Sequence, residues 1–146
     1  MGTTKIRRIF MKTKITEENL SLISLVLRLS IGTLFLGAGI IKVQGGIDGN
    51  ITYYMSIFEK SIFPHTLIKA HASVIMIVEF ILAVWLFSGV QLKKAWFASI
   101  TILISLAFGM IFVYKFDVVS DNYIYVLISC LGVALTPYDS YKIYSK

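Results

Sequence analysis

Long apolar runs alternate with short polar segments along most of this chain. Because an α-helix rises 1.5 Å per residue, the first run, at about residues 20–43, is about 35 Å long. That length is enough to cross the hydrocarbon core of a bilayer, which is about 30 Å thick. The pattern predicts an all-α integral membrane four-helix bundle over residues 20–146, after a basic tail at residues 1–19. Its spans are expected at about residues 20–43, 66–90, 95–115 and 122–144.

The fourth run is the least regular, because its apolar part is short and it contains Pro137. Proline removes a backbone donor and kinks a helix. We therefore expect a kinked helix that continues along the membrane interface, where tyrosines are common. Residues 115–122 are polar and are expected to form the loop before this span. The tyrosines of the expected interfacial part are Tyr138, Tyr141 and Tyr144.

The segment between the first two runs predicts a short amphipathic helix. After the glycine-rich stretch at residues 45–49, apolar side chains recur at helical spacing, while polar ones fall on the other side. Such a pattern is typical of a helix that lies in the membrane interface. Pro64 is expected to end it or to start the next span. The apolar positions are Ile51, Tyr54, Met55, Phe58 and Ile62, and the polar ones are Asn50, Ser56, Glu59 and Lys60.

The composition agrees with a lipid-embedded protein and sets the expected orientation. Hydrophobic residues make up 57% of the chain, only 15% are charged, and the mean hydropathy is +0.79. The net charge of +6 does not indicate nucleic-acid binding, because the basic residues flank the apolar runs. Lys and Arg favour the cytoplasmic side. They are densest in the first fourteen residues, the 91–94 turn and the C-terminal tail. This distribution predicts a multi-pass plasma or inner membrane protein with both ends in the cytoplasm. The true start, Met1 or Met11, stays open.

Two charged residues are expected inside the bilayer, where charge is costly and needs a reason. Arg28 lies about 12 Å into the first span and Glu79 about 16 Å into the second. Antiparallel neighbours would bring them to similar depth, so the sequence predicts an Arg28–Glu79 ion pair. Such a pair could fix helix register, or it could form a polar site for a substrate headgroup or a proton. The third alternative is an Arg28 that snorkels to the interface without a partner.

Small residues predict where the helices pack closely. In the first span Arg28, Gly32, Phe35, Gly39 and Lys42 share one stripe, which places glycines between two basic residues. Glycine and other small residues let membrane helices approach one another. Further seams are expected in the third and fourth spans, and their members are Thr101, Ser105, Gly109, Tyr125, Ser129, Gly132 and Thr136.

His71 is expected near the outer end of the second span, as a hydrogen-bonding residue or part of the polar site. It lies six residues after His65, with no third ligand close by, so no metal site is predicted. No CxxCH motif, deep histidine pair or phosphate-binding loop is present. The chain itself is therefore expected to carry no cofactor.

With these residues in hand, the chain resembles the DoxX-like family of small four-helix membrane proteins, which includes subunits of thiosulfate:quinone oxidoreductase and MauE-like proteins. The resemblance covers about residues 22–136. It rests on the stripe from Arg28 to Lys42, on Glu79 within the second span, and on the basic turn at Lys93 and Lys94. It implies that Arg28, Lys42 and Glu79 occupy the family's polar positions. The tyrosine-rich C-terminus and Pro137 have no place in the pattern.

The resemblance favours a small, non-catalytic membrane subunit of a redox-linked complex, with quinone as a candidate ligand and other membrane subunits as partners. Two alternatives stay open. The first is a purely structural or assembly subunit. The second is a small transporter or proton-relay protein, which would need oligomers to provide alternating access.

Overall fold

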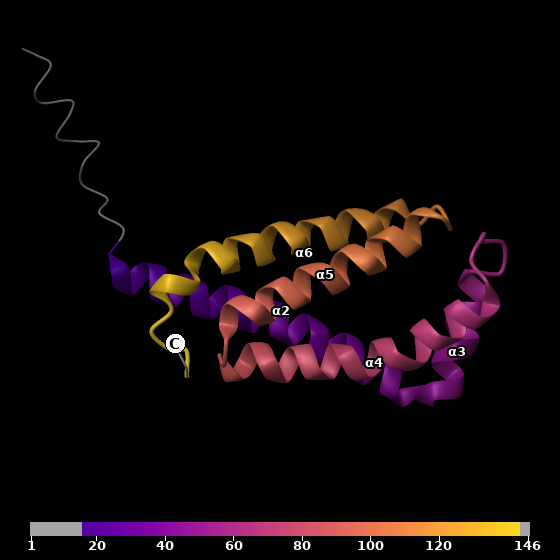
Figure 1. Ribbon diagram of the computed structural model, residues 1–146, viewed down its shortest axis with the longest axis horizontal. Helices are drawn as coiled ribbons and strands as arrows, with labels where there is room; N and C mark the ends of the chain where they lie inside the picture. The colour runs from indigo at the N-terminus through magenta and orange to yellow at the C-terminus, as the bar shows by residue number, and fades with distance from the viewer. Residues whose placement is uncertain (1–15, 144–146) are drawn as a thin grey trace, which may run out of the picture.

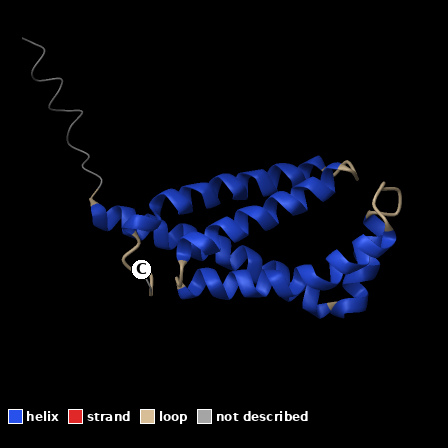
Figure 2. Ribbon diagram, viewed as in Figure 1, coloured by secondary structure: helices blue, strands red, loops and turns tan. Residues whose placement is uncertain are grey.

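The computed structural model describes residues 16–143, and all regular structure within them is helical (Figures 1 and 2). The helices are α2 (Glu17–Gln44), α3 (Gly46–Ile57), α4 (His65–Ser88), α5 (Leu92–Ile111) and α6 (Phe116–Leu135), followed by the short 3-10 helix η1 (Thr136–Tyr138). Four of them, α2, α4, α5 and α6, are long and apolar enough to cross a bilayer. The all-α fold with four candidate spans is therefore confirmed. The predicted basic tail, except for its last residues, and Tyr144 lie outside the described residues.

The helices form two antiparallel pairs, with α2 packed along α4 and α5 along α6, while α2 also contacts α6 (Figure 1). A turn joins α4 to α5 at one end of the bundle, which we name the turn end. The described chain both begins and ends there. The opposite end carries α3 and is named the α3 end. Helices α4 and α5 diverge from the turn that joins them toward the α3 end. Away from this turn they make few contacts with each other.

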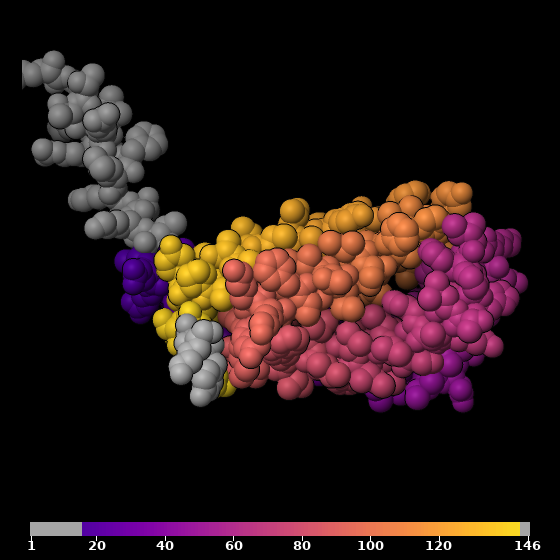
Figure 3. All heavy atoms as spheres, viewed as in Figure 1, coloured from indigo at the N-terminus to yellow at the C-terminus, as the bar shows by residue number. Residues whose placement is uncertain are grey.

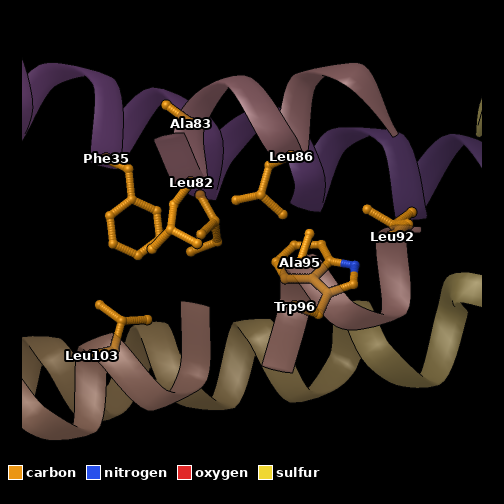
Figure 4. Close-up of a cluster of buried hydrophobic side chains, with 9 residues drawn as sticks. Phe35, Leu82, Ala83, Leu86, Leu92, Ala95, Trp96 and Leu103 are labelled. Atoms are coloured by element: carbon orange, nitrogen blue, oxygen red, sulfur yellow. The ribbon is translucent and has the colours of Figure 1, made fainter. Parts of the chain in front are cut away.

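A central apolar cluster holds the two pairs together (Figure 4). Trp96 of α5 is completely buried at its centre, and Phe35 of α2 is 2% exposed. The Trp96 ring lies against Gly132 of α6, where any side chain would collide with the indole. The packing of α5 against α6 at this point therefore requires a glycine at position 132, opposite Trp96, the largest fully buried side chain. The other buried members are Ile31, Leu82, Ala83, Leu86, Leu92, Ala95 and Leu103.

Two glycines of α2 fix its register against α4. A side-chain carbon on Gly32 would lie 2.5 Å from the Phe87 ring, and one on Gly39 would lie 3.1 Å from the Phe80 ring. The predicted stripe is confirmed in that Arg28, Gly32, Phe35 and Gly39 are all buried. This register leaves the first turns of α2 extending past the α4–α5 turn (Figure 1).

The predicted short helix is present as α3, although its polar face differs from the expectation. Asn50 was predicted on the polar side, but it is 5% exposed, and its side-chain amide donates a hydrogen bond to the Ala72 carbonyl of α4. Tyr54 and Phe58 are buried one and two turns later. The helix is therefore fastened to α4 by a buried amide as well as by its apolar side chains.

The fourth span differs from the prediction at both ends. Residues 116–122 were expected in a loop, but they form the first turns of α6, with Asp117 in its first turn. An acidic residue there is favourable, because the helix dipole is positive at its N-terminus. At the other end, α6 stops at Leu135, and Pro137 belongs to η1. No helix continues from Asp139 to Ile143, the last described residue, so the predicted interfacial continuation is wrong.

Candidate functional site

The first buried ion pair joins Lys42, near the end of α2, to Glu79 in the middle of α4. The ammonium group of Lys42 donates a hydrogen bond to Oε1 of Glu79. The glutamate side chain is 2% exposed and that of Lys42 is 17% exposed. The second oxygen, Oε2, has no hydrogen-bond partner among the described residues. A buried carboxylate oxygen normally has a partner, so this oxygen can still accept a hydrogen bond.

Arg28 does not pair with Glu79, so that prediction is wrong. Its Nη1 lies 3.4 Å from Oδ2 of Asp139, in the segment after η1. The same carboxylate oxygen accepts a hydrogen bond of 3.0 Å from the Ser24 hydroxyl. The Ser21 hydroxyl accepts one, also of 3.0 Å, from the backbone N–H of Ser140. Together these contacts fasten the C-terminal segment across the first part of α2.

The register of α2 against α4 explains the wrong pairing. Because Gly39 faces Phe80, Glu79 lies close to the level of Gly39 and Lys42. A side-chain carbon on Gly89, which ends α4 with φ of +68°, would lie 2.5 Å from Nη1 of Arg28. Arg28 is therefore at the level of the α4–α5 turn, about ten residues from the level of Glu79, which is roughly 15 Å along a helix.

A cavity of about 190 Å³ lies beside the Lys42–Glu79 pair, between α2, α3, α4, α5 and α6. We name it the polar pocket. Its polar lining residues are Lys42, Tyr54, Glu79, Asn122 and Tyr125, and apolar ones complete the wall: Leu34, Phe35, Ala38, Leu103, Leu106, Met110 and Val118.

The polar pocket offers both donors and acceptors. Burial, with the nearby carboxylate of Glu79, raises the pKa of the Tyr54 hydroxyl, so this group stays neutral and can donate a proton in a hydrogen bond. Asn122 is engaged through its amide nitrogen with the Val118 carbonyl, which leaves its amide oxygen as an acceptor. The arrangement suits a small planar molecule with polar groups at its edge and apolar faces.

His71 and the predicted helix-packing residues of α5 and α6 differ in how far they are buried. His71 is partly buried on α4, where its ring meets that of Tyr54 with centroids 5.8 Å apart. Gly109 approaches Phe58 of α3, and Gly132 approaches Trp96. Ser105 and Thr101 do not form the predicted packing seam, since both are exposed and bond to carbonyls of their own helix. Ser99 is the buried hydroxyl of α5 instead. No group of three metal-ligating side chains lies together within residues 16–143.

Replacement of Asp139 by alanine is expected to release the C-terminal segment from α2. The change removes the partner of Arg28 and of the Ser24 hydroxyl, so the free energy of unfolding should fall by about 1–2 kcal/mol, since water can then reach Arg28. Limited proteolysis of the purified protein checks this result, with cleavage after Lys142 expected to become faster. The exposed Asp121 provides the control as Asp121→Ala. Unchanged protection in Asp139→Ala would contradict the assignment.

The fold and these contacts define a small multi-pass membrane protein with two buried ion pairs at different levels. A family model described as methylamine utilisation protein MauE matches residues 20–121, which is 102 of the 146 residues. The chain therefore belongs to the MauE family, which lies in the DoxX-like clan of small membrane proteins. The match includes Arg28, Lys42 and Glu79 but ends before Asp139. No curated protein and no solved structure matches the chain.

Proposed function

We propose that this chain is a small membrane subunit of a redox-linked complex in methylamine utilisation, and that its polar pocket holds the headgroup of a quinone. Membership of a family of methylamine utilisation proteins supports the pathway. The observation that supports a quinone as the ligand is Oε2 of Glu79, which has no hydrogen-bond partner among the described residues. This oxygen is buried next to a cavity and beside a lysine ammonium. A quinone ring combines apolar faces with oxygen atoms at its edge, which is the chemistry that the pocket lining complements.

The residues would recognise the two redox forms differently. The Lys42 ammonium and the Tyr54 hydroxyl can donate to a quinone carbonyl, whereas Oε2 of Glu79 can accept from the hydroxyl of a hydroquinone. Reduction of a quinone consumes two electrons and two protons. In this proposal the electrons come from cofactors of partner subunits. This chain only binds and orients the quinone ring. In this proposal the chain lies in the plasma or inner membrane with both ends in the cytoplasm.

A purely structural role is the alternative, and one observation favours it. Arg28 and Glu79 each have a partner of opposite charge, Asp139 and Lys42, as they would if each ion pair only joined two segments of the fold. Under that role, complexes carrying Glu79→Gln would assemble in lower yield but would turn over at the normal rate per assembled complex. Under the proposed role, turnover per assembled complex would fall as well.

Glu79→Gln is expected to weaken binding of a short-chain benzoquinone in its reduced form by about tenfold, because an amide oxygen replaces a charged acceptor. Binding is measured by calorimetry on the protein in lipid nanodiscs, after mass spectrometry of gently extracted protein for associated quinones and subunits. Glu59→Gln, at an exposed position after α3, is the matched control and should bind normally. Failure of the unaltered protein to bind any quinone would rule out the proposed ligand.

A further inference from the structure

A second cavity, of about 260 Å³, lies at the α3 end between α3, α4 and α5. We name it the side cavity. Its lining is mostly aromatic and aliphatic, with Phe58 and Phe63 from the α3 region, Leu67 and Ile68 from α4, and Phe108 from α5, and it also includes His71 and Ser105. Phe58 packs against Phe63, whose ring lies 5.0 Å from that of Phe112. These aromatic contacts form one apolar wall of the side cavity, on the side where α4 and α5 diverge.

The side cavity adjoins the polar pocket. Tyr54, Leu106 and Met110 line both, so the two spaces are separated by no more than these side chains. Tyr54 lines both spaces and lies near the carboxylate of Glu79, and burial together with this carboxylate raises the pKa of its hydroxyl. A single molecule could therefore place a polar part against Glu79 and an apolar part among the phenylalanines.

The mouth of the side cavity faces lipid. Leu67 of α4 and Phe108 of α5 stand at its rim, and each is 55% exposed. Both belong to helices that are long and apolar enough to span the membrane. Large apolar side chains exposed on such helices contact acyl chains in a bilayer. Figure 3 shows the face on which the magenta atoms of α3 and its following loop meet the orange atoms of α5 and α6.

We propose that the side cavity holds the first part of the isoprenoid tail of the quinone, which passes between α4 and α5 into the lipid. This inference rests on the proposed function, since it takes the headgroup to be in the polar pocket. The tail then follows the space between the diverging helices, and a quinone would reach the pocket sideways from the bilayer. Most of the side-cavity lining is apolar and complements a hydrocarbon chain, and its polar residues are Tyr54, His71 and Ser105.

Ser105→Phe tests this inference, because Ser105 lines the side cavity from an exposed position and bonds only to its own helix. A phenylalanine there would occupy the mouth without removing a contact between helices. The matched control is Thr101→Phe, one turn earlier on α5, which is also exposed and self-bonded but does not line the cavity. Both variants are titrated in nanodiscs with a quinone that carries several isoprene units and with the same ring lacking a tail.

The expected result is that Ser105→Phe weakens binding of the tailed quinone by about tenfold, which corresponds to roughly two methylene groups leaving an apolar site. Binding of the tailless ring should not change, and Thr101→Phe should bind both ligands normally. Equal binding of tailed and tailless quinones by the unaltered protein, with no effect of Ser105→Phe, would overturn the tail site while the headgroup site stands. Binding of neither ligand would overturn both proposals.

Discussion

Lys42→Met is expected to lower the free energy of unfolding by about 3–5 kcal/mol, because it leaves the carboxylate of Glu79 buried without its counter-charge. Methionine keeps the length and most of the apolar stem of lysine, so little packing is lost with the ammonium group. The Glu79 side chain is 2% exposed in the folded chain. The stability of the protein in lipid, followed by thermal melting and by steric trapping, measures the loss.

The double variant Lys42→Met with Glu79→Leu separates stability from function. Apolar replacement of a whole buried ion pair is often neutral or stabilising. The double variant should therefore recover most of the stability that the single change removes, yet it should not bind quinone. A single variant as stable as the unaltered protein would show that the pair contributes nothing to the fold. A double variant that is stable and still binds quinone would remove Lys42 and Glu79 from the ligand site.

Trp96→Ala is expected to lower the free energy of unfolding by about 3–5 kcal/mol, because it leaves a cavity in the apolar cluster between the two helix pairs. Trp96 is fully buried and packs on Gly132 of α6. The exposed neighbour Phe97 provides the control as Phe97→Ala, which should change stability little in a detergent or lipid environment. Melting temperatures of the two variants in the same detergent provide the comparison.

A size exchange between the two positions gives a sharper test of the same contact. A side-chain carbon on Gly132 would collide with the indole ring, so Gly132→Leu alone should be destabilising by about 3 kcal/mol. In the presence of Trp96→Ala, the leucine can occupy the space that the indole leaves. The double variant should then be more stable than either single one. Additive losses would mean that the two residues do not share a packing site.

The features that could be predicted from the sequence depend on local pattern. The four spans follow from apolar runs longer than the bilayer core is thick. The buried face of α2 follows from the recurrence of Arg28, Gly32, Phe35 and Gly39 at helical spacing, because lipid-facing charge and glycine are both unfavourable there. The short helix α3 follows from the spacing of its apolar residues.

The ion pairs could not be predicted, because they depend on how far one helix slides along its neighbour. The predicted depths of Arg28 and Glu79 are distances from the ends of their apolar runs. Helix α2 has 28 residues, however, and its first turns extend beyond α4, so equal depth within each run did not mean equal height in the bundle. Asp139 follows a proline near the end of the chain, and nothing in its local sequence shows that it is buried.

Polarity also misled the prediction at two positions, of exposure at Asn50 and of helix formation at Asp117. Asn50 is polar, yet it is buried because its side-chain amide donates a hydrogen bond to the Ala72 carbonyl of α4. Asp117 is charged, yet it belongs to a helix because an acidic group suits the first turn. In both cases a backbone group decided the outcome, and backbone partners are not visible in a pattern of side chains.

The fastening of Asp139 to α2 has a consequence for the order in which the protein is made. Ser24 and Asp139 are 115 residues apart, so Arg28 enters the membrane long before its counter-charge leaves the ribosome. All four spans must be synthesised before the turn end can close. Until then the growing chain has to keep an unneutralised guanidinium group near water or lipid phosphates.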